Sequence, residues 1–425
     1  MLDLTGKTVA ILGAGRSGQA AAVLAAHCGA SVTIYDSREA PGAVLATPGT
    51  GEGINADLVV VSPGIETKGD FVQSFAKGSG ALWGEVELAW RCYPGITIGI
   101  TGTNGKTTTT ELVRDLVEAT GKSCVACGNY GVPLSEVVLY TEVPDVIALE
   151  LSSFQLETIA DFRPDAAIWL NFSPDHMDRY TSVEEYREAK LRILENITAE
   201  TPVVVRAGED LPEKGKVITF SSEEKADWSL QGDQILKGSE TFLAMSGTRL
   251  RGLHNAENIM AACAIVEGLT AEIAREALAK YSPPEHRCEL VAIIDGVEYL
   301  NDSKATNLHA LESALRSQTR PTILIAGGKE KGLDYQPLAP LLREKVKEMI
   351  SFGQIGAALK ETFSEVVTCK NVETLDEAVA LATASSLAGD TVLFSPGTSS
   401  FDQFNGYEAR GAAFKAAVPR LTRTL

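Results

Sequence analysis

The chain contains 425 residues, of which 44% are hydrophobic and 22% are charged. This length exceeds one ordinary hydrophobic core, so we expect two or three domains. The formal net charge of −18 argues against a nucleic-acid partner, because phosphate backbones attract a surplus of Lys and Arg. A membrane span needs about 20 consecutive apolar residues. The apolar runs here are only strand-sized, so no membrane partner is expected.

The seven cysteines are odd in number and scattered. Cys124 and Cys127 have a Cys-x-x-Cys spacing, but no second pair accompanies them at the spacing of a zinc site. We therefore predict reduced thiols in a cytoplasmic protein and assign no redox role to this pair. Asp3 and Lys7 precede a short apolar run that ends in glycines, which is not the pattern of a signal peptide.

Strand-like and helix-like runs alternate through most of the chain, as they do in α/β domains with largely parallel sheets. The first unit is expected to contain a strand over 8–12, a helix over 17–28 and a strand over 31–35. The second unit begins near Pro94. Its expected elements are strands over 96–100, 146–149 and 166–170, a helix over 106–119, and short β segments between 200 and 252.

One helical stretch over 255–280 then leads to Pro283 and Pro284, which cannot continue a helix. The third unit is predicted from strands over 289–294, 322–325 and 391–394, followed by a C-terminal helix. The predicted fold class is therefore α/β with three domains, and their predicted limits are 1–92, 93–284 and 285–425.

A glycine turn joins the first predicted strand to the first predicted helix. Residues 13–18, Gly-Ala-Gly-Arg-Ser-Gly, fit the pattern Gly-x-Gly-x-x-Gly, in which backbone amides approach a phosphate at a helix N-terminus. Asp36 ends the second strand, close to where dinucleotide enzymes carry a ribose-binding acid. This motif alone is compatible with a nicotinamide-dependent oxidoreductase or with a tight turn that binds no ligand.

A second glycine-rich loop, residues 101–108, follows a predicted strand and opens a predicted helix. Its glycines let backbone amides face phosphate oxygens, Lys106 would reach the terminal phosphates, and the Thr107 hydroxyl would bind magnesium. The strict Walker spacing requires glycine at the position of Ile100, so the match is to a shorter Gly-Thr-Asn-Gly-Lys-Thr form. The residues predicted to bind ATP here are Gly102, Thr103, Asn104, Gly105, Lys106, Thr107 and Thr108.

This loop resembles the phosphate loop of the Mur ligases and folylpolyglutamate synthases, which form amide bonds through acyl phosphates. Residues 150–157 (Glu-Leu-Ser-Ser-Phe-Gln-Leu-Glu), 175–180 (Asp-His-Met-Asp-Arg-Tyr) and 301–307 (Asn-Asp-Ser-Lys-Ala-Thr-Asn) resemble the D-glutamate-adding branch of the Mur ligases. Other branches differ in the third segment. The resemblance extends from Gly13 to beyond Tyr407 and implies an N-terminal Rossmann-like domain for a UDP sugar, a central P-loop ATPase domain with a parallel sheet, and a C-terminal Rossmann-like domain that closes over them.

The implied activity is ATP-dependent addition of D-glutamate to UDP-N-acetylmuramoyl-L-alanine through an acyl phosphate, in peptidoglycan precursor synthesis. The resemblance implies ATP and two Mg²⁺ ions as cofactors and a monomeric enzyme; the D configuration comes from the resemblance alone. Three alternatives are another amide ligase such as a folylpolyglutamate synthase, a Rossmann oxidoreductase, and a regulatory nucleotide-binding module. Segment 302–306 and the complete N-terminal unit argue against a folylpolyglutamate synthase. An oxidoreductase would leave the phosphate loop unused. A regulatory module would not need Glu150, His176 and Lys304 together.

The resemblance also assigns site residues. The implied metal ligands are Thr107, Glu150, His176 and Lys190, the lysine as a carbamate, and the implied catalytic residues are Lys106, His176, Lys190 and Lys304. Asn255 and Asn258 have helical spacing that puts both amides on one face, where they could pair with adenine. Arg287 and Asp302 complete the implied ATP site. From the residues alone, helix capping stays open for Glu150 and Asn255, a core position for His176, and a structural ion pair for Asp302 with Lys304.

Two further sets follow from the resemblance. The implied UDP-sugar residues are Ser17, Asp36, Ser37, Arg38, Gly64, Asn129, Ser152 and Gln155, and the implied glutamate-binding residues are Thr306, Lys331, Ser400 and Tyr407. Tyr130 stands where many family members carry an aliphatic residue, and Tyr407 stands where phenylalanine is common. Lys329 lies close enough to Lys331 to be confused with it in an alignment.

Overall fold

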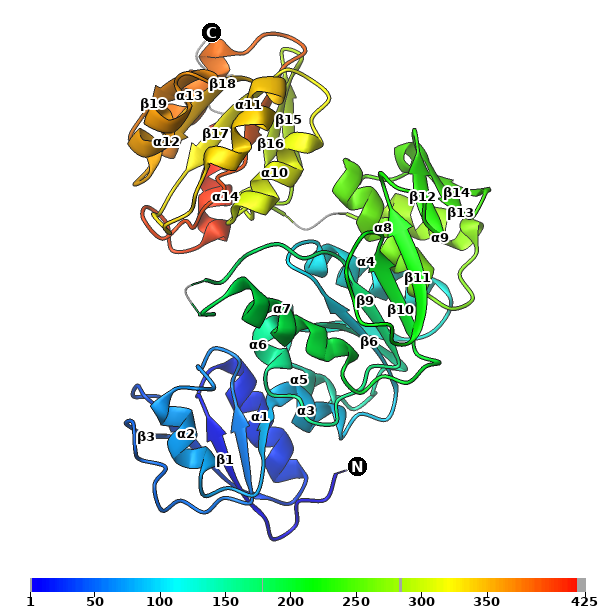
Figure 1. Ribbon diagram of the computed structural model, residues 1–425, viewed down its shortest axis with the longest axis vertical. Coiled ribbons are helices and arrows are strands. Elements are labelled where there is room, and N and C mark those ends of the chain that lie inside the picture. Colours follow the sequence, from blue (N-terminus) through cyan, green and yellow to red (C-terminus); the bar gives the residue numbers. More distant parts are fainter. Residues whose placement is uncertain (1, 178, 283–284, 419–425) are drawn as a thin grey trace. The chain divides into compact units, whose positions relative to one another are not determined.

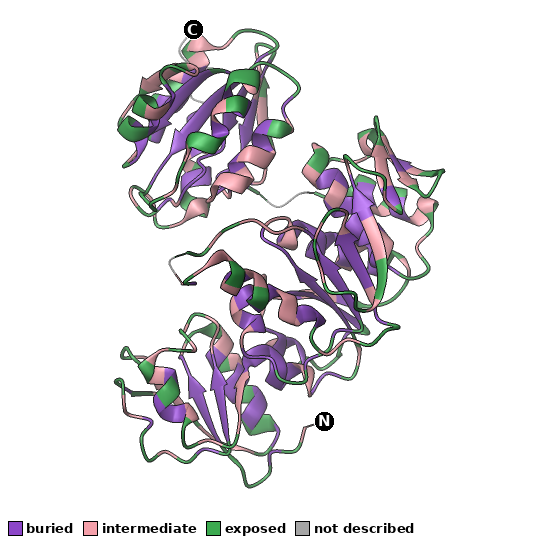
Figure 2. Ribbon diagram, in the orientation of Figure 1, coloured by how far each residue is buried: buried purple, intermediate pink, exposed green. Residues whose placement is uncertain are grey.

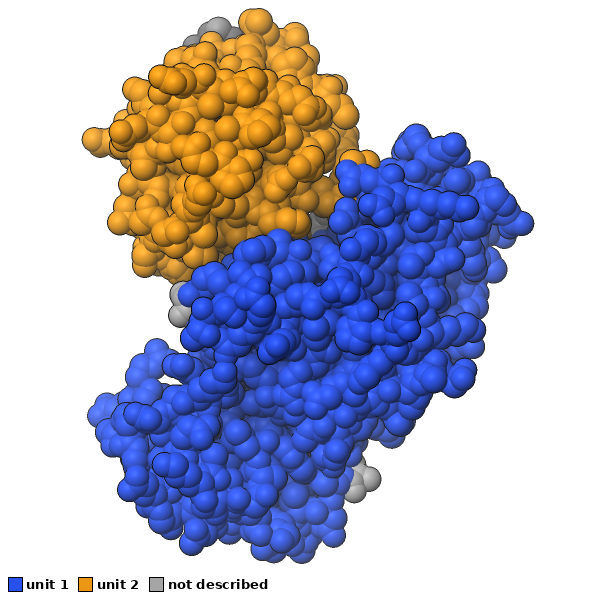
Figure 3. Space-filling view, in the orientation of Figure 1, with its two compact units in different colours: residues 1–248, 257–281 blue, residues 249–256, 282–425 orange. Residues whose placement is uncertain are grey.

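The computed structural model describes residues 2–177, 179–282 and 285–418. The described chain forms three sheets covered by helices, which confirms the predicted α/β class (Figure 1). It divides into two compact units, residues 1–248 with 257–281 and residues 249–256 with 282–425 (Figure 3). The first unit holds the first two sheets, and the second unit holds the third sheet.

The first sheet has the strand order β3-β2-β1-β4-β5, and all of its pairings are parallel. Its inner strand β4 reads Leu-Val-Val-Val and is buried on both faces, as a strand between two helical layers must be (Figure 2). The elements of this part are β1 (Thr8–Leu12), α1 (Arg16–His27), β2 (Ser31–Asp36), β3 (Ala43–Leu45), β4 (Leu58–Val61), α2 (Asp70–Ala76), β5 (Leu82–Gly84) and α3 (Glu85–Trp90).

The second sheet has the order β14-β13-β12-β11-β10-β9-β6-β8-β7, with β12, β13 and β14 paired antiparallel at one edge. Its strands are β6 (Ile96–Thr101), β7 (Cys124–Gly128), β8 (Val146–Glu150), β9 (Ala166–Trp169), β10 (Pro202–Arg206), β11 (Lys216–Ser221), β12 (Trp228–Gln231), β13 (Gln234–Lys237) and β14 (Glu240–Ala244). The associated α-helices are α4 (Lys106–Ala119), α5 (Leu134–Val137), α6 (Ser153–Leu156), α7 (Val183–Leu191), α8 (Leu253–Ile265) and α9 (Ala271–Lys280). Because β6 lies between β8 and β9, ligands are expected at the carboxyl ends of these three strands.

The third sheet has the order β15-β16-β20-β17-β18-β19 and is parallel except for the β15–β16 pair. Its strands are β15 (Glu289–Ile294), β16 (Val297–Asn301), β17 (Thr322–Gly327), β18 (Val346–Phe352), β19 (Thr368–Asn371) and β20 (Thr391–Phe394). Its helices are α10 (Leu308–Arg316), α11 (Ala339–Lys345), α12 (Gly356–Phe363), α13 (Leu375–Ser385) and α14 (Tyr407–Ala417).

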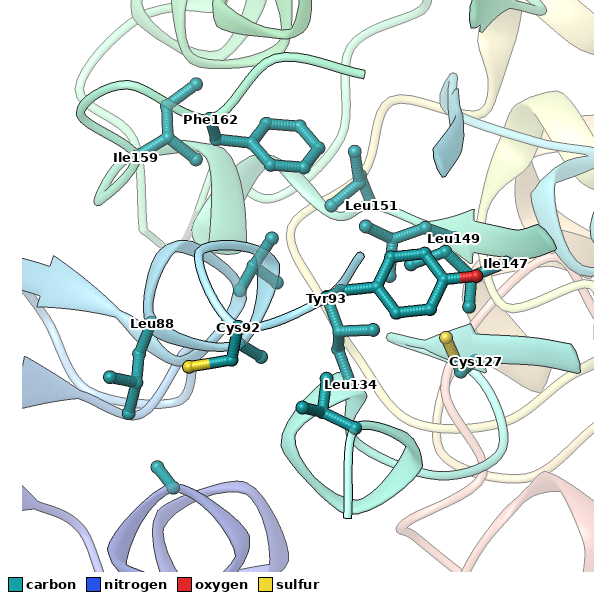
Figure 4. Packing of buried hydrophobic residues seen from close by; sticks show 14 of the residues in the cluster. Leu88, Cys92, Tyr93, Cys127, Leu134, Ile147, Leu149, Leu151, Ile159 and Phe162 are labelled. Atoms are coloured by element: carbon teal, nitrogen blue, oxygen red, sulfur yellow. The ribbon is translucent and has the colours of Figure 1, made fainter. Parts of the chain in front are cut away.

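The first two sheets share a continuous apolar core. Figure 4 shows Leu88 and Cys92 in one cluster with Leu134 and Leu149, which belong to the second sheet and its helices. A fully buried leucine of this kind stabilises the fold by roughly 1.5–3 kcal/mol. The buried carboxylate of Glu87 adds a polar connection, because it accepts hydrogen bonds from the backbone of residues 160–162. These contacts explain why the first two predicted domains form one compact unit.

The predicted helix over 255–280 is wrong as a single element. The structure has two helices, α8 and α9, separated by residues 266–270. Gly268 adopts a φ of +74°, which ends helical geometry, and the Thr270 hydroxyl caps the second helix by accepting from the Ile273 amide. Pro283 and Pro284, which were predicted to end the helical stretch, lie outside the described residues.

The other expected elements are found within one or two residues of their predicted limits, and α4 spans the predicted 106–119. All seven cysteines are free thiols, and five of them are buried. Across the described part of the chain, no helix is long and apolar enough to cross a membrane. The domain limits 92/93 and 284/285 stay predictions.

Candidate active site

The phosphate loop leaves β6 and enters α4 in a shape that only glycine accommodates at two positions. Gly102 and Gly105 have φ values of +152° and +85°. A Cβ on Gly102 would lie 2.9 Å from the Cβ of Leu170, and one on Gly105 would lie 2.4 Å from Oδ1 of Asn258. The loop therefore packs directly against its surroundings and ends at the N-terminus of α4, where helices favour anions.

A neighbouring segment after β9 braces this loop. The backbone amides of Thr103 and Asn104 donate to the backbone oxygen and Oδ1 of Asn171, each at 2.9 Å, and Asn171 Nδ2 donates back to the Asn104 carbonyl. The Thr103 hydroxyl accepts from the Ser173 amide and donates to the Ser173 carbonyl. These bonds hold the loop rigid, which preorganises it for an anionic ligand.

Lys106 begins α4, and its ammonium donates to the carbonyl oxygens of Gly102 and Thr103 at 2.9 Å each. Thr107 and Thr108 follow in the first helical turn and are buried. The charge of Lys106 is thus concentrated over the loop, together with the partial positive charge of the helix N-terminus. Both features favour a polyphosphate despite the negative charge of the whole protein.

Glu150 ends β8, next to β6, and only 3% of it is exposed. Its Oε1 accepts from Nδ2 of Asn129 at 2.7 Å, whereas its Oε2 is buried without a hydrogen-bond partner among the described residues. A buried carboxylate oxygen that lacks a donor is costly unless a cation approaches it. Carboxylate oxygen is also the ligand type that Mg²⁺ prefers. Glu150 therefore fits a magnesium ligand.

Lys190 lies on α7 with only 1% of its surface exposed. Its Nζ donates to the Gly102 carbonyl at 2.9 Å and lies 4.9 Å from the ring centroid of Tyr186. Burial and the charge of Lys106 hold the pKa of Lys190 well below its ordinary value, although Asp175 and Glu150 oppose the shift. The fold thus brings together Lys106, Glu150 and Lys190 from three different segments.

His176 follows β9 and has a φ of +57°, a left-handed conformation that is unusual for a residue with a side chain. Its ring packs edge-on against Phe154 and Tyr186, at centroid distances of 5.0 and 5.8 Å, while its side chain is 45% exposed. No group of three or more His, Cys, Asp and Glu side chains in the described ranges could hold a metal. The implied magnesium set depends instead on the Thr107 hydroxyl and a modified Lys190.

The first sheet carries the implied UDP-sugar residues. The Asp36 carboxylate accepts from the backbone amides of Ala14 and Arg38, and the Ala14 bond is the main cause of the lowered pKa of Asp36. Asp36 thus holds the glycine turn. A Cβ on Gly18 would lie 1.8 Å from the Gly13 carbonyl oxygen, so close packing explains this glycine. Three other implied sugar-nucleotide residues, Ser37, Arg38 and Gly64, are exposed.

Ser152 and Gln155 form a capping box at the start of α6. The Gln155 amide donates to the Ser152 hydroxyl oxygen, and Gln155 Oε1 accepts from the Ser152 amide. A structural role therefore accompanies the implied role in sugar binding. Arg179, which the sequence analysis did not single out, donates to the backbone oxygens of Pro63 and Ile65 and to the Glu157 carboxylate. It ties the loop that carries Gly64 to the segment that carries His176.

In the third sheet, Asp302 is buried and accepts from the Ser395 hydroxyl at 2.7 Å and from the Cys288 amide at 3.2 Å. Burial raises the pKa of Asp302 to about 7, although Arg287 opposes the shift. The Lys304 ammonium lies 3.7 Å from the ring centroid of Tyr407, a cation–π contact. The structure thus brings Lys304 and Tyr407 together, whereas Asp302 is held by other partners.

Two loops at the carboxyl end of this sheet carry further implied glutamate-binding residues. Ser400 is buried, and Lys331 is exposed. The loops are joined because the Lys329 amide donates to the Ser399 carbonyl and the Thr398 hydroxyl donates to the Lys329 carbonyl. Thr306 lies in the connection between β16 and α10.

Arg410 is a buried residue that the sequence analysis missed. Its guanidinium is 0% exposed and donates to the carbonyl oxygens of Ser303 and Thr398 and to the Ser303 hydroxyl. Burial lowers the pKa of Arg410 to about 10. No sequence signal distinguished it from a surface arginine, since its partners lie 107 and 12 residues away.

Comparison with known proteins decides the family. Residues 100–266 match the family described as Mur ligase middle domain, and residues 286–397 match the Mur ligase glutamate ligase domain. A UDP-N-acetylmuramoylalanine--D-glutamate ligase from Chlorobium chlorochromatii is 37% identical, with 98% of this chain and 99% of the relative covered. A relative of the same name from Syntrophotalea carbinolica is 38% identical, with 99% of each chain covered. The chain belongs to the Mur ligase family.

Solved Mur ligases share this fold at low sequence identity. A MurF ligase from Thermotoga maritima, solved in complex with ADP, aligns with a TM-score of 0.62 and 18% identity, and 99% of this chain and 96% of that chain are covered. A pseudomurein peptide ligase type C from Methanothermus fervidus aligns with a TM-score of 0.60 and 16% identity, covering 98% and 100% of the two chains. At these identities the likeness supports the Mur ligase fold alone.

The two asparagines implied for adenine binding have different surroundings in this Mur ligase. Asn258 Oδ1 accepts from the Thr109 hydroxyl at 3.2 Å, so this amide packs against α4. Asn255 Nδ2 donates to the Arg251 carbonyl at 2.8 Å. Asn258 belongs to the first compact unit and Asn255 to the second, although both lie on α8. Each side-chain amide therefore has a structural partner within the protein, and the role of the two asparagines in adenine binding stays a prediction.

Proposed function

We propose that this chain is an ATP-dependent amide ligase that joins D-glutamate to UDP-N-acetylmuramoyl-L-alanine in peptidoglycan precursor synthesis. The observation that carries the proposal is the meeting of Lys106, Lys190 and the unpartnered Glu150 Oε2 at the carboxyl edge of the second sheet. This arrangement suits phosphoryl transfer, in which the protein mainly positions groups and neutralises charge. The names of relatives that span nearly the whole chain support the same activity.

Two Mg²⁺ ions are part of this proposal. The residues that would hold them are Thr107, Glu150, His176 and Lys190, the last as a carbamate. When bound, Mg²⁺ acts as a Lewis acid that polarises phosphoryl oxygens and neutralises developing charge. The buried, unpartnered Oε2 of Glu150 is the structural feature that supports a cation here.

In the first step, an oxygen of the alanyl carboxylate attacks the γ-phosphorus of ATP. The bond from this phosphorus to the bridging oxygen breaks, and ADP leaves with the electron pair, so an acyl phosphate remains. We assign Lys106 to the charge of the transferring phosphoryl group, because its ammonium already lies over the phosphate loop. Asn255, Asn258, Arg287 and Asp302 complete the proposed ATP site.

In the second step, the glutamate amine attacks the acyl carbon, the carbon–oxygen bond to phosphate breaks as the tetrahedral intermediate collapses, and the nitrogen releases a proton to solvent. We assign the acceptor to Thr306, Lys331, Ser400 and Tyr407, with Lys304 as a cation near the reacting groups. The loop-to-loop bonds through Lys329 and Thr398 support a joint role for the two loops. No side-chain nucleophile is required, since the bound phosphate already activates the acyl carbon and serves as the leaving group.

The sugar nucleotide is assigned to the first domain, residues 1–92, with Ser17, Asp36, Ser37, Arg38 and Gly64, and to Asn129, Ser152 and Gln155 of the second. ATP is assigned to residues 93–284, and glutamate to residues 285–425, which would close over the site. We further propose a monomeric, cytoplasmic enzyme; the seven free cysteines support a reducing compartment.

Phosphate release tests the activity. We expect release to require ATP, magnesium, UDP-N-acetylmuramoyl-L-alanine and D-glutamate together. Equal release without the sugar nucleotide would exclude this ligase activity. A folylpolyglutamate synthase would instead release phosphate with a folate and glutamate, so a parallel assay with folate separates the two amide ligases.

A further inference from the structure

The loop after β7 brings an exposed asparagine onto a buried carboxylate. Gly128 pairs with Glu150 at the ends of β7 and β8, and the next backbone amide, that of Asn129, donates to the Glu150 carbonyl at 2.9 Å. The Asn129 side chain then donates from Nδ2 to Glu150 Oε1 at 2.7 Å. Asn129 therefore contacts Glu150 through both its backbone and its side chain.

Close packing makes this double contact possible. A Cβ on Gly128 would lie 2.4 Å from the Glu150 carbonyl oxygen, and its φ is +104°. Any larger residue at this position would separate the two strand ends. The loop closes on itself because the Gly128 amide donates to the Val132 carbonyl at 2.9 Å.

The same loop is anchored on its other side by Tyr130. Its hydroxyl donates to one oxygen of the Glu111 carboxylate on α4, and the Tyr281 hydroxyl donates to the other oxygen. Glu111 is itself buried. The tyrosine at position 130 thus holds the loop against the helix that begins at Lys106.

The hydrogen bond between Asn129 and Glu150 determines which carboxylate oxygen is left for a cation. A carboxylate accepts hydrogen bonds and cannot donate when ionised, so the amide nitrogen of Asn129 must face Oε1. This bond prevents rotation of the carboxylate and leaves Oε2 as the buried oxygen without a partner. It also leaves the Asn129 amide oxygen for other contacts, so a contact with the sugar nucleotide is compatible with it.

We propose that Asn129 is a positioning residue that orients Glu150, so that Oε2 is presented to Mg²⁺. The proposal rests on the proposed function, in which Glu150 is a magnesium ligand. Residues that hydrogen-bond a metal ligand typically change metal affinity by about ten- to a hundredfold when they are removed. Asn129 differs from a simple substrate contact because its loss should change metal affinity without any sugar nucleotide present.

The experiment measures Mn²⁺ binding by electron paramagnetic resonance in the presence of the non-hydrolysable ATP analogue AMP-PNP and without sugar nucleotide. Asn129→Ala should raise the dissociation constant for Mn²⁺ about tenfold or more, and its thermal unfolding temperature should stay close to that of the wild type. Asn196→Ala is the matched control, because the Asn196 amide donates only to the backbone oxygens of Ala160 and Phe162 in its described bonds. This control should bind Mn²⁺ like the wild type.

Glu150→Gln separates the two hypotheses. If Glu150→Gln loses Mn²⁺ while Asn129→Ala binds it within twofold of wild type, the positioning role is wrong and the metal ligand stands. If Glu150→Gln binds Mn²⁺ normally, or if the wild type binds none beyond that held by the analogue, the ligand assignment and the positioning role both fail. Should Asn129→Ala unfold, Asn129→Leu, which keeps a side chain of similar size but has no hydrogen-bond donor, provides the same measurement.

Discussion

The side-chain nitrogen of Lys190 lies 2.9 Å from the carbonyl oxygen of Gly102, although the two residues are 88 positions apart. This contact places a buried amine beside the phosphate loop. The neighbouring charge of Lys106 and the burial both favour the neutral amine, which is the form that adds carbon dioxide. The structure thus gives a physical reason to expect a modified lysine at this position.

Lys190→Ala is expected to be nearly inactive, because the carbamate oxygens proposed to bind Mg²⁺ are lost. Added short carboxylates such as formate or acetate should partly restore turnover, since they supply the missing oxygen ligand. Phosphate release measures both effects. Lys216→Ala, which removes an exposed lysine, should retain wild-type turnover. Full activity of Lys190→Ala would contradict the carbamate.

Lys106→Ala should lose turnover by roughly a hundred- to a thousandfold, since contacts to transition-state charge of this kind are worth roughly 3–4 kcal/mol. Thermal unfolding should change little, because the ammonium donates to carbonyl oxygens of its own loop and not to another sheet in these two bonds. Lys122→Ala, which removes an exposed lysine between α4 and β7, is the control. More than a tenth of wild-type turnover would reject the role of Lys106.

Arg38→Ala should raise the KM for UDP-N-acetylmuramoyl-L-alanine and leave the KM for ATP nearly unchanged, since a ground-state contact to one substrate is lost. Steady-state kinetics with each substrate varied in turn gives the two values. Lys77→Ala removes an exposed cation at the end of α2 and serves as the control. An equal rise in both KM values would contradict the assignment of the two substrates to different domains.

The Asp302 carboxyl should make the stability of the protein depend on pH. Burial raises its pKa to about 7 from an ordinary value of 3.8. Between these values the folded protein keeps a proton that the unfolded chain has released, so this group's contribution to stability is lost as pH rises towards 7. Asp302→Asn removes the effect, and its thermal midpoint relative to wild type should therefore be higher at pH 8 than at pH 5.

Thermal unfolding of the ligand-free protein at both pH values tests this expectation. Asp334→Asn changes an exposed carboxylate in the third domain and should show no such difference. If Asp302→Asn differs from wild type by the same amount at both pH values, Asp302 does not titrate in this range.

Lys331→Ala should raise the KM for D-glutamate at least tenfold, because the loss of a charge-assisted hydrogen bond costs about 1.5–3 kcal/mol. The KM for UDP-N-acetylmuramoyl-L-alanine should change little. Lys329→Ala is the necessary control, since its backbone, not its side chain, joins the two loops in the described bonds. A selective effect of Lys329→Ala instead would move the proposed acceptor site by two residues.

Local sequence determined the elements whose signals are short-range. The phosphate loop and α4 follow from glycines and an apolar run within about twenty residues, and the strands β1 and β6 follow from continuous apolar segments. The break between α8 and α9 also had a local signal in Gly268 and Thr270. It was missed because the apolar pattern continued on both sides of it.

Only the tertiary structure decided which side chains meet. Glu150 ends β8 and Asn129 follows the adjacent strand β7, 21 residues away, and Arg410 reaches Ser303 across 107 residues. Composition and spacing carry no information about such partners, because strand order and loop packing bring them together. The sequence by itself therefore determined the family and the phosphate loop, whereas the roles of the candidate site residues stay predictions. The buried state of Lys190 and Arg410, and the orientation of Glu150, depend on long-range packing that excludes water from those groups.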